Sequence, residues 1–135
     1  MSQGQEEGCG GAPPAAAPED AIVQYLLIRS DLDKGRYNRG ALIAQGAHAS
    51  VAAIESSREL ESTRAYLASI ESMHKIVLAA PSAEDIHRVS SALTAATLQH
   101  HVWLEQPERV VTALATAPYK RSVLSSFFAG LKLLR

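Results

Sequence analysis

The stretch Tyr25–Ala53, YLLIRSDLDKGRYNRGALIAQGAHASVAA, decides the fold and holds most of the candidate functional side chains. It begins within an apolar run, IVQYLLI (Ile22–Ile28), whose β-branched and aromatic residues predict a strand buried on both faces. A polar loop rich in Asp, Asn and Gly follows. From Gly40 the sequence is rich in alanine, which predicts a helix able to lie close to a sheet. The stretch therefore predicts a strand–loop–helix unit.

The middle of the chain predicts two more helices and a second strand. A helix is expected from about Ser62 to Met73, with Ser62 or Thr63 as its N-cap. The apolar run over residues 74–80 predicts another buried strand, ended by a proline. Ser82, with Asp85 three residues later, resembles a capping box and opens a helix that is expected to end near residue 98.

The last third of the chain predicts a hairpin and a final helix. Residues 101–105 and 109–117 are expected to form two strands joined by a tight turn. Apolar residues at helical spacing from Leu124 to Leu134 predict one face of an amphipathic helix. Phe127 and Phe128 on that face are expected in the core, with a partner surface as the alternative. Together the elements predict one α/β domain over residues 21–135, a four-stranded mixed sheet with helices on both faces.

Composition agrees with one globular domain. The chain has 135 residues, 47% of them hydrophobic and 20% charged. No apolar stretch approaches the length of a membrane span, and the acidic, polar start lacks the features of a secretion signal, so a cytoplasmic protein without membrane association is expected. Residues 1–20 are rich in Gly, Pro and Ala and are expected to be a disordered tail. The single cysteine, Cys9, excludes an internal disulfide.

Charge is unevenly distributed along the chain. All 13 Lys and Arg residues lie after residue 20, so the domain is net basic although the whole chain has a formal charge of −1. Four of the bases fall close together in and beside the first loop: Arg29, Lys34, Arg36 and Arg39. A local surplus of this kind can attract an RNA backbone.

One face of the Gly40 helix carries side chains suited to ester chemistry. Gln45 and His48 are spaced i and i+3, and Ala41 lies four positions before Gln45. The amides of Ala41 and Leu42 at the helix start are candidates to stabilise phosphate or an oxyanion. The alternative is that His48 is a packing histidine hydrogen-bonded to backbone.

Two further aromatic positions have structural interpretations. Trp103 is expected to be a half-buried packing residue, with stacking on a terminal adenine as the alternative. His100 and His101 are adjacent in a predicted strand and point to opposite faces, so no metal site is expected there.

The order of these motifs resembles the type II peptidyl-tRNA hydrolases, which cleave the ester linking a peptide to the 3′ end of tRNA. The resemblance is carried by Asp31-Leu32, by Gly40–Ala49 (GALIAQGAHA), and by Thr112–Pro118 and Gly130–Leu133 near the end. The chain departs from the family pattern where Ala41 replaces the catalytic lysine. Glu105-Gln106-Pro107 replaces an Asp-Ala-Gly segment. These departures are most similar to the divergent branch called peptidyl-tRNA hydrolase domain-containing proteins.

The resemblance implies a set of site residues and a partner, with no cofactor and no metal. The implied catalytic residues are Gln45, His48, Glu105 and Thr112. The implied tRNA-binding residues are Asp31, Lys34, Arg36, Arg39 and Gly40. The expected function is cleavage, at a reduced rate, of the ester between a peptidyl or acyl group and tRNA in translation. The alternative is a catalytically inactive tRNA- or protein-binding module that keeps the hydrolase fold; a homodimer also stays open.

Overall fold

Strand β2 (Ile22–Arg29) lies inside the sheet of the computed structural model, which describes residues 20–135. It pairs in parallel with β3 (Lys75–Ala80) and antiparallel with β5 (Val110–Thr116). β4 (His100–Glu105) extends the sheet, giving the order β3-β2-β5-β4. The short strand β6 (Tyr119–Lys120) pairs with the start of β2. The predicted mixed α/β sheet is confirmed, with β6 as a fifth strand that the sequence pattern did not predict.

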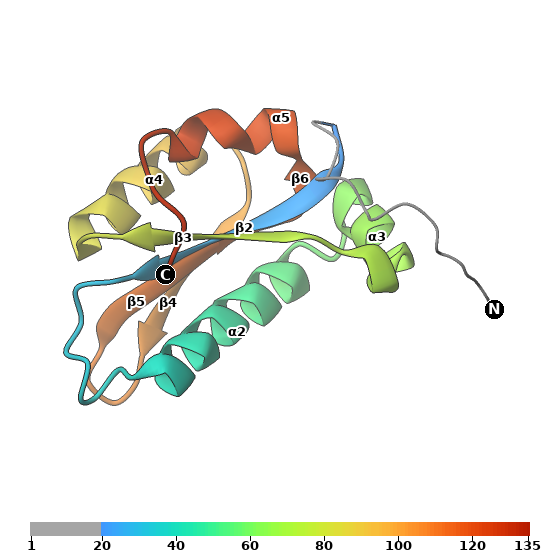
Figure 1. Ribbon diagram of the computed structural model, residues 1–135. Helices are drawn as coiled ribbons and strands as arrows, with labels where there is room; N and C mark the ends of the chain where they lie inside the picture. The colour runs from blue at the N-terminus through green and yellow to red at the C-terminus, as the bar shows by residue number, and fades with distance from the viewer. Residues whose placement is uncertain (1–19) are drawn as a thin grey trace.

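Helices cover both faces of this sheet (Figure 1). α2 (Arg39–Ser56) packs on one face, and α4 (Ala83–Ala95) with α5 (Arg121–Leu124) and the 3₁₀ turn η2 (Ser125–Phe128) packs on the other. Residues 1–19, including Cys9 and nearly all of the predicted tail, lie outside the described part of the chain. Within residues 20–135 no helix has the length and apolar character needed to cross a membrane.

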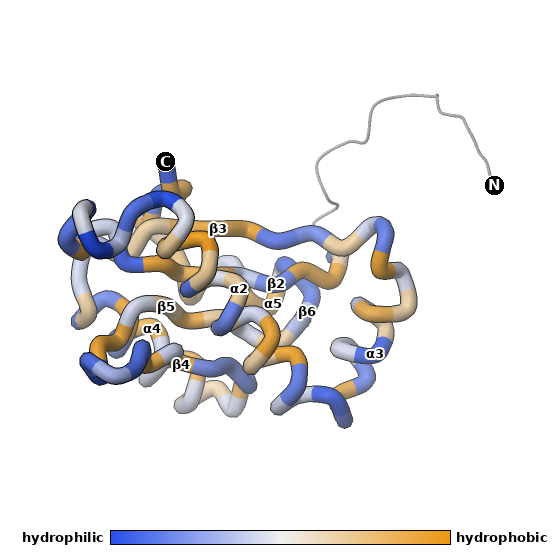
Figure 2. The backbone as a smooth tube through the Cα atoms, turned by 90° about the horizontal axis from the view of Figure 1, so that it is seen from below, coloured by the Kyte–Doolittle hydropathy of each residue, from blue (hydrophilic) through white to orange (hydrophobic). Residues whose placement is uncertain are grey.

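Alternate residues of β2 enter two separate cores. Val23, Tyr25 and Leu27 pack with side chains of α4, α5 and η2. Leu26 and Ile28 pack on the opposite face against alanines of α2 and β5. All five side chains are buried, which confirms the predicted strand covered on both faces. The strands beside β2 are also largely hydrophobic, as the orange segments of β3 and β5 show in Figure 2.

Small side chains let α2 approach the sheet closely, as predicted. Ala49 and Ala53 are fully buried against β2 and β5. A Cβ atom added at Gly46 would lie 2.9 Å from Ile28 Cδ1 and 3.3 Å from Leu26 Cδ2. This close packing fixes the position of α2 relative to the strands that carry the candidate site.

The predicted helix over residues 62–73 is shorter than expected and has a different cap. It is divided into α3 (Glu61–Ala68) and the 3₁₀ turn η1 (Ile70–Ser72), and its N-cap is Leu60. The Ser62 hydroxyl donates to the carbonyl of Pro118, and the buried Thr63 hydroxyl shares a hydrogen bond with Ser57. Because both hydroxyls are engaged in these contacts, neither caps the helix. The capping box of Ser82 and Asp85 is confirmed, since Ser82 accepts from the Asp85 amide.

The final amphipathic helix predicted up to Leu134 is wrong. The helical region ends with η2, and Gly130 has a φ of +86°, which favours glycine and turns the chain away. The last residues run along the free edge of β3, where the Ala79 amide donates to the Lys132 carbonyl at 2.8 Å and the Leu134 amide to Val77 at 3.1 Å. Phe128 is buried and stacks on Tyr25, so its predicted place in the core is confirmed.

Candidate functional site

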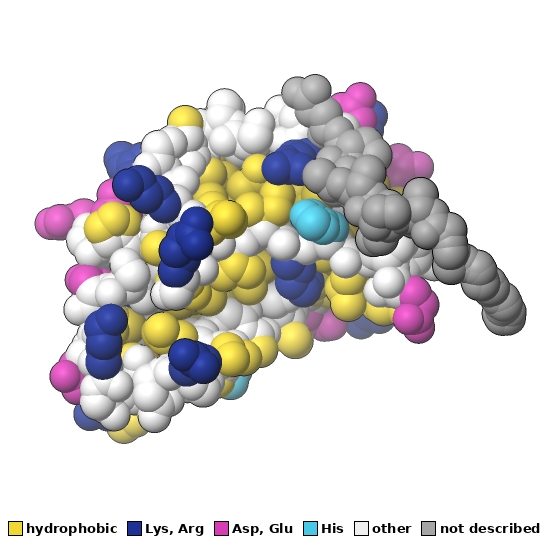
Figure 3. All heavy atoms as spheres, in the orientation of Figure 1, with side chains coloured by type: hydrophobic (Ala, Val, Ile, Leu, Met, Phe, Trp, Pro, Cys, Tyr) yellow, Lys and Arg dark blue, Asp and Glu magenta, His cyan; other side chains and the backbone are white. Residues whose placement is uncertain are grey.

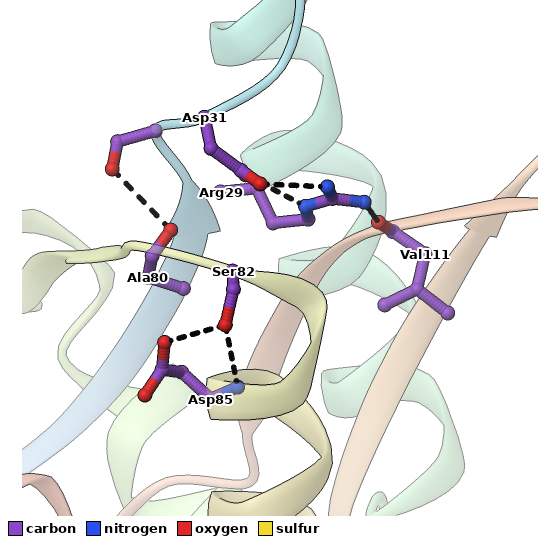
Figure 4. A network of polar contacts seen from close by, with 7 residues as sticks. Arg29, Asp31, Ala80, Ser82, Asp85 and Val111 are labelled. Carbon is purple, nitrogen blue, oxygen red and sulfur yellow. Dashed lines mark hydrogen bonds and ion pairs between the residues drawn. The ribbon is translucent and has the colours of Figure 1, made fainter.

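The loop after β2 is held at its start by an arginine–carboxylate pair (Figure 4). Arg29 donates to both carboxylate oxygens of Asp31 at 2.9 Å and to the Val111 carbonyl at 3.0 Å. The hydrogen bond from Arg29 holds the pKa of Asp31 below its usual value. Asp31, predicted to contact tRNA, therefore has its carboxylate engaged by Arg29, and the pair ties the loop to β5.

Replacing Asp31 by asparagine is expected to destabilise the protein at neutral pH by less than about 1 kcal/mol, since the pair is partly exposed. The folded pKa lies below the unfolded one, so the stabilisation is present above about pH 4 and is lost as the pH falls through the folded pKa. Urea unfolding of wild type and Asp31→Asn should differ at pH 7, and the difference should shrink as the pH is lowered through the acidic range. Glu71→Gln, at an exposed position, is the control; a difference independent of pH would contradict this role.

A second anchor joins the middle of the loop to the β4–β5 turn. Glu108 forms an ion pair with Arg36 and accepts a hydrogen bond from the buried Tyr37 hydroxyl at 3.3 Å. Its own backbone amide and Arg36 lower the pKa of Glu108, whereas burial raises the pKa of Tyr37. Neither Tyr37 nor Glu108 was among the predicted site residues. Arg36 is thus engaged, whereas Lys34 and Arg39 are exposed and form no ion pair with any residue between 20 and 135.

Asn38 caps α2 and changes which amides are available at its start. The Asn38 side chain accepts from the Ala41 amide at 3.0 Å, and its carbonyl accepts from Leu42 at 2.9 Å. The expectation that the Ala41 and Leu42 amides bind an oxyanion is therefore wrong, because both are already hydrogen-bonded. The first-turn donors that remain belong to Arg39 and Gly40. An Asn directly before the helix is the sequence signal that could have shown this cap.

Gln45 and Thr112 form the buried centre of the site. The Thr112 hydroxyl donates to Gln45 Oε1 at 2.6 Å, and their residues are 0% and 3% exposed. Thr112 reaches α2 because of a bulge: Trp103 pairs with Ala113 and Leu104 with Val111, which leaves Thr112 without a partner across the strand. Both Thr112 and Ala113 therefore face α2. With Oε1 occupied, the amide nitrogen of Gln45 donates to no other group in the described chain and is available to a ligand.

His48 and Glu105 are linked through Trp103. The imidazole of His48 stacks on Trp103 with ring centroids 4.8 Å apart, and Trp103 Nε1 donates to Glu105 Oε1 at 3.0 Å. His48 is exposed and its ring forms no hydrogen bond with the backbone of residues 20–135, so the alternative of a packing histidine hydrogen-bonded to backbone is wrong. Trp103 is partly buried and packs on α2, as expected. Glu105 has its carboxylate held by Trp103 rather than by His48.

The structure brings four predicted residues to one face of the sheet: Gln45, His48, Thr112 and Glu105. Together they offer an amide donor, an exposed imidazole and a carboxylate, which are groups used in general acid–base hydrolysis. Ala41 lies on the same face of α2, one turn before Gln45, and adds no charge. No cluster of three or more metal-ligating side chains occurs among residues 20–135, and the imidazole of His100 points the other way, to Ser90.

Comparisons of the amino-acid sequence with known proteins identify the family of this chain. Residues 22–134 match the family model described as peptidyl-tRNA hydrolase PTH2. This chain belongs to the PTH2 family. The human protein named "Putative peptidyl-tRNA hydrolase PTRHD1" is 33% identical over 123 residues, covering 90% of this chain and 88% of the human one. The mouse protein of the same name is 33% identical over 129 residues, covering 94% and 89%. The resemblance stated from the sequence, including its divergent branch, is confirmed.

Proposed function

We propose that this PTH2-family protein hydrolyses the ester between a peptidyl or acyl group and tRNA, at a rate reduced by alanine in place of the family's lysine. The buried hydrogen bond between Thr112 and Gln45 is the observation that carries the proposal. It accompanies a strand bulge and buries two polar side chains, and it leaves the amide nitrogen of Gln45, three residues before His48 on α2, without a hydrogen-bond partner among residues 20–135. Such preorganisation is expected of a catalytic group rather than of core packing.

The chemistry follows from the groups present. A water molecule adds to the ester carbonyl while His48 accepts its proton, imidazole being the side chain suited to proton transfer near neutral pH. The amide nitrogen of Gln45 stabilises the oxyanion. Collapse of the intermediate breaks the bond to the 3′ oxygen of tRNA, which takes the proton from His48. Trp103 holds the imidazole plane, and Glu105 orients Trp103 through its hydrogen bond.

The exposed cations of the loop supply the tRNA contact in this proposal. Lys34 and Arg39 lie beside the start of α2, and Gly40 leaves room for a phosphate to approach the helix amides. Asp31 and Arg36 act indirectly, by holding the loop in place. Such a protein would work on the products of translation in the cytoplasm.

The alternative function is a non-catalytic module that binds tRNA or protein, and Ala41 is the feature that favours it. The two are separated by hydrolysis of an N-acetylated aminoacyl-tRNA by the full chain. Wild type is expected to exceed the buffer rate, and Gln45→Ala and His48→Ala are each expected to lower its rate at least about tenfold. His87→Ala, at an exposed position of α4 on the other face of the sheet, serves as the matched histidine control. If wild type hydrolysed the substrate no faster than buffer but still bound tRNA, the hydrolase proposal would be wrong and the non-catalytic binding module would be the remaining function.

A further inference from the structure

A long apolar groove lies on the other side of α2 from the Gln45–His48 site. It runs between α2, the outer edge of β3, α3 and the C-terminal residues, with a volume of about 1180 Å³. Ile43 and Val51 of its α2 wall are 66% and 68% exposed, and Ile70 and Met73 of the opposite wall are 49% and 43% exposed. Figure 3 shows this face, with hydrophobic side chains gathered along its middle and Lys and Arg side chains around them. Exposed apolar surface on this scale marks a binding surface.

One lysine in the lining of this groove has no acidic partner. The Lys75 ammonium donates to Gln24 Oε1 at 2.6 Å and to the Tyr66 hydroxyl at 3.2 Å. Burial lowers the pKa of Lys75. Within residues 20–135 its hydrogen-bond acceptors are neutral, and no carboxylate forms an ion pair with it.

The two acceptors of Lys75, Gln24 and Tyr66, already form other hydrogen bonds and carry no charge that could balance the ammonium. Gln24 is fully buried, donates to the carbonyls of Ser50 and Thr116, and also accepts from the Ser50 hydroxyl. Tyr66 donates to the His74 carbonyl, and burial raises the pKa of Tyr66 to about 12, which keeps the phenol protonated. An ammonium carries three donors, and two are used here. The third remains for an external acceptor, and a half-buried cation is stabilised most by an anion.

The remaining charges of the groove also favour an anionic ligand. Besides Lys75, its lining contains three basic residues, Lys34, Arg39 and Arg135, and one acidic residue, Glu55, whereas its Arg29 is already paired with Asp31. A second copy of the chain seated on this face would bring the same basic rim against its own, which is unfavourable. The apolar strip on α2 from Ile43 to Ile54 is about 16 Å long at the rise of an α-helix. These features suit an extended apolar chain with an anionic end.

We propose that this groove binds a linear aliphatic carboxylate, with the carboxylate on Lys75 Nζ and the chain along the α2 wall. The volume of about 1180 Å³ is somewhat above the roughly 300–1,000 Å³ usual for small-molecule sites, which leaves room for a long alkyl chain. The carboxylate completes the hydrogen bonding of Lys75, and the alkyl chain covers Val51 and its exposed neighbours. This site is separate from the Gln45–His48 cluster and does not depend on hydrolase activity.

Calorimetric titration of the full chain with monomeric dodecanoate tests the proposal. Saturable binding is expected at one site. Lys75→Met should weaken it by at least about tenfold, because a charge-assisted hydrogen bond is lost. Val51→Glu, at an exposed position on the groove wall, should weaken it similarly without affecting folding. Lys120→Met and Val123→Glu are matched controls at exposed positions outside the groove and should bind as wild type does.

The headgroup is tested with dodecyltrimethylammonium, which has the same chain and the opposite charge. It is expected to bind at least about tenfold more weakly than dodecanoate. Equal binding of the two amphiphiles, unchanged binding by Lys75→Met, or the lack of saturable binding would overturn the proposal. A dimer in sedimentation velocity that Val51→Glu dissociates, with no dodecanoate bound by wild type, would show instead that a second copy covers the groove.

Discussion

The Ala41→Lys variant should hydrolyse peptidyl-tRNA about 10²–10³ times faster than wild type, because a preorganised charge at a reacting oxygen commonly contributes a factor of this size. Ala41 lies in the first turn of α2, one turn before Gln45, and its side chain is partly exposed. Its amide is already bound by Asn38, so a longer side chain leaves the helix cap intact. The measurement is kcat/KM for an N-acetylated aminoacyl-tRNA.

The matched control for this gain is Ala47→Lys. Ala47 lies on the same helix but lines the apolar groove, so a lysine there adds the same charge on the wrong side of α2. Thermal unfolding of both variants would verify that the fold is retained. If Ala41→Lys and Ala47→Lys changed the rate equally, tRNA attraction alone would explain the gain, and the proposed place of Ala41 in the site would be wrong.

The second large effect is expected from Thr112→Val. Valine has nearly the shape of threonine but leaves the buried Gln45 Oε1 without its donor, which should lower the free energy of unfolding by about 1–3 kcal/mol. Because Thr112 is a positioning residue, hydrolysis should fall through kcat more than through KM. Thr112→Ser keeps the hydroxyl and should recover most of the rate.

Thr94→Val, on the exposed face of α4, controls for the loss of a threonine hydroxyl as such. Urea unfolding and steady-state kinetics on the same preparations separate stability from activity. Wild-type rates for Thr112→Val, at a temperature where it is folded, would show that the bond to Gln45 serves packing only.

Local patterns in the sequence predicted the elements whose cause is local. The apolar run of β2 and the Ser82 capping box are examples, since each depends on residues within a few positions of one another. The family resemblance implied Gln45 and Thr112 as site residues, whereas the bulge that brings them together depends on strand register, which the pattern does not specify.

The features that were missed depend on contacts between distant parts of the chain. Leu131 and Leu134 have helical spacing, but after Gly130 they pack on opposite faces of the sheet as the chain crosses the edge of β3. Glu108 becomes part of the site only because the β4–β5 turn meets Tyr37. The groove beside α2 could not be predicted from local sequence patterns either, because its walls come from segments far apart in the sequence.

A double-mutant cycle on ester hydrolysis tests most directly whether Gln45 and Thr112 act as one catalytic unit. The rates of wild type, Gln45→Ala, Thr112→Val and the double variant would be measured with the same peptidyl-tRNA under single-turnover conditions. We expect wild-type hydrolysis above the buffer rate, a large loss in each single variant, and little further loss in the double variant. Wild-type hydrolysis no faster than buffer, or losses that simply multiply in the double variant, would contradict this account.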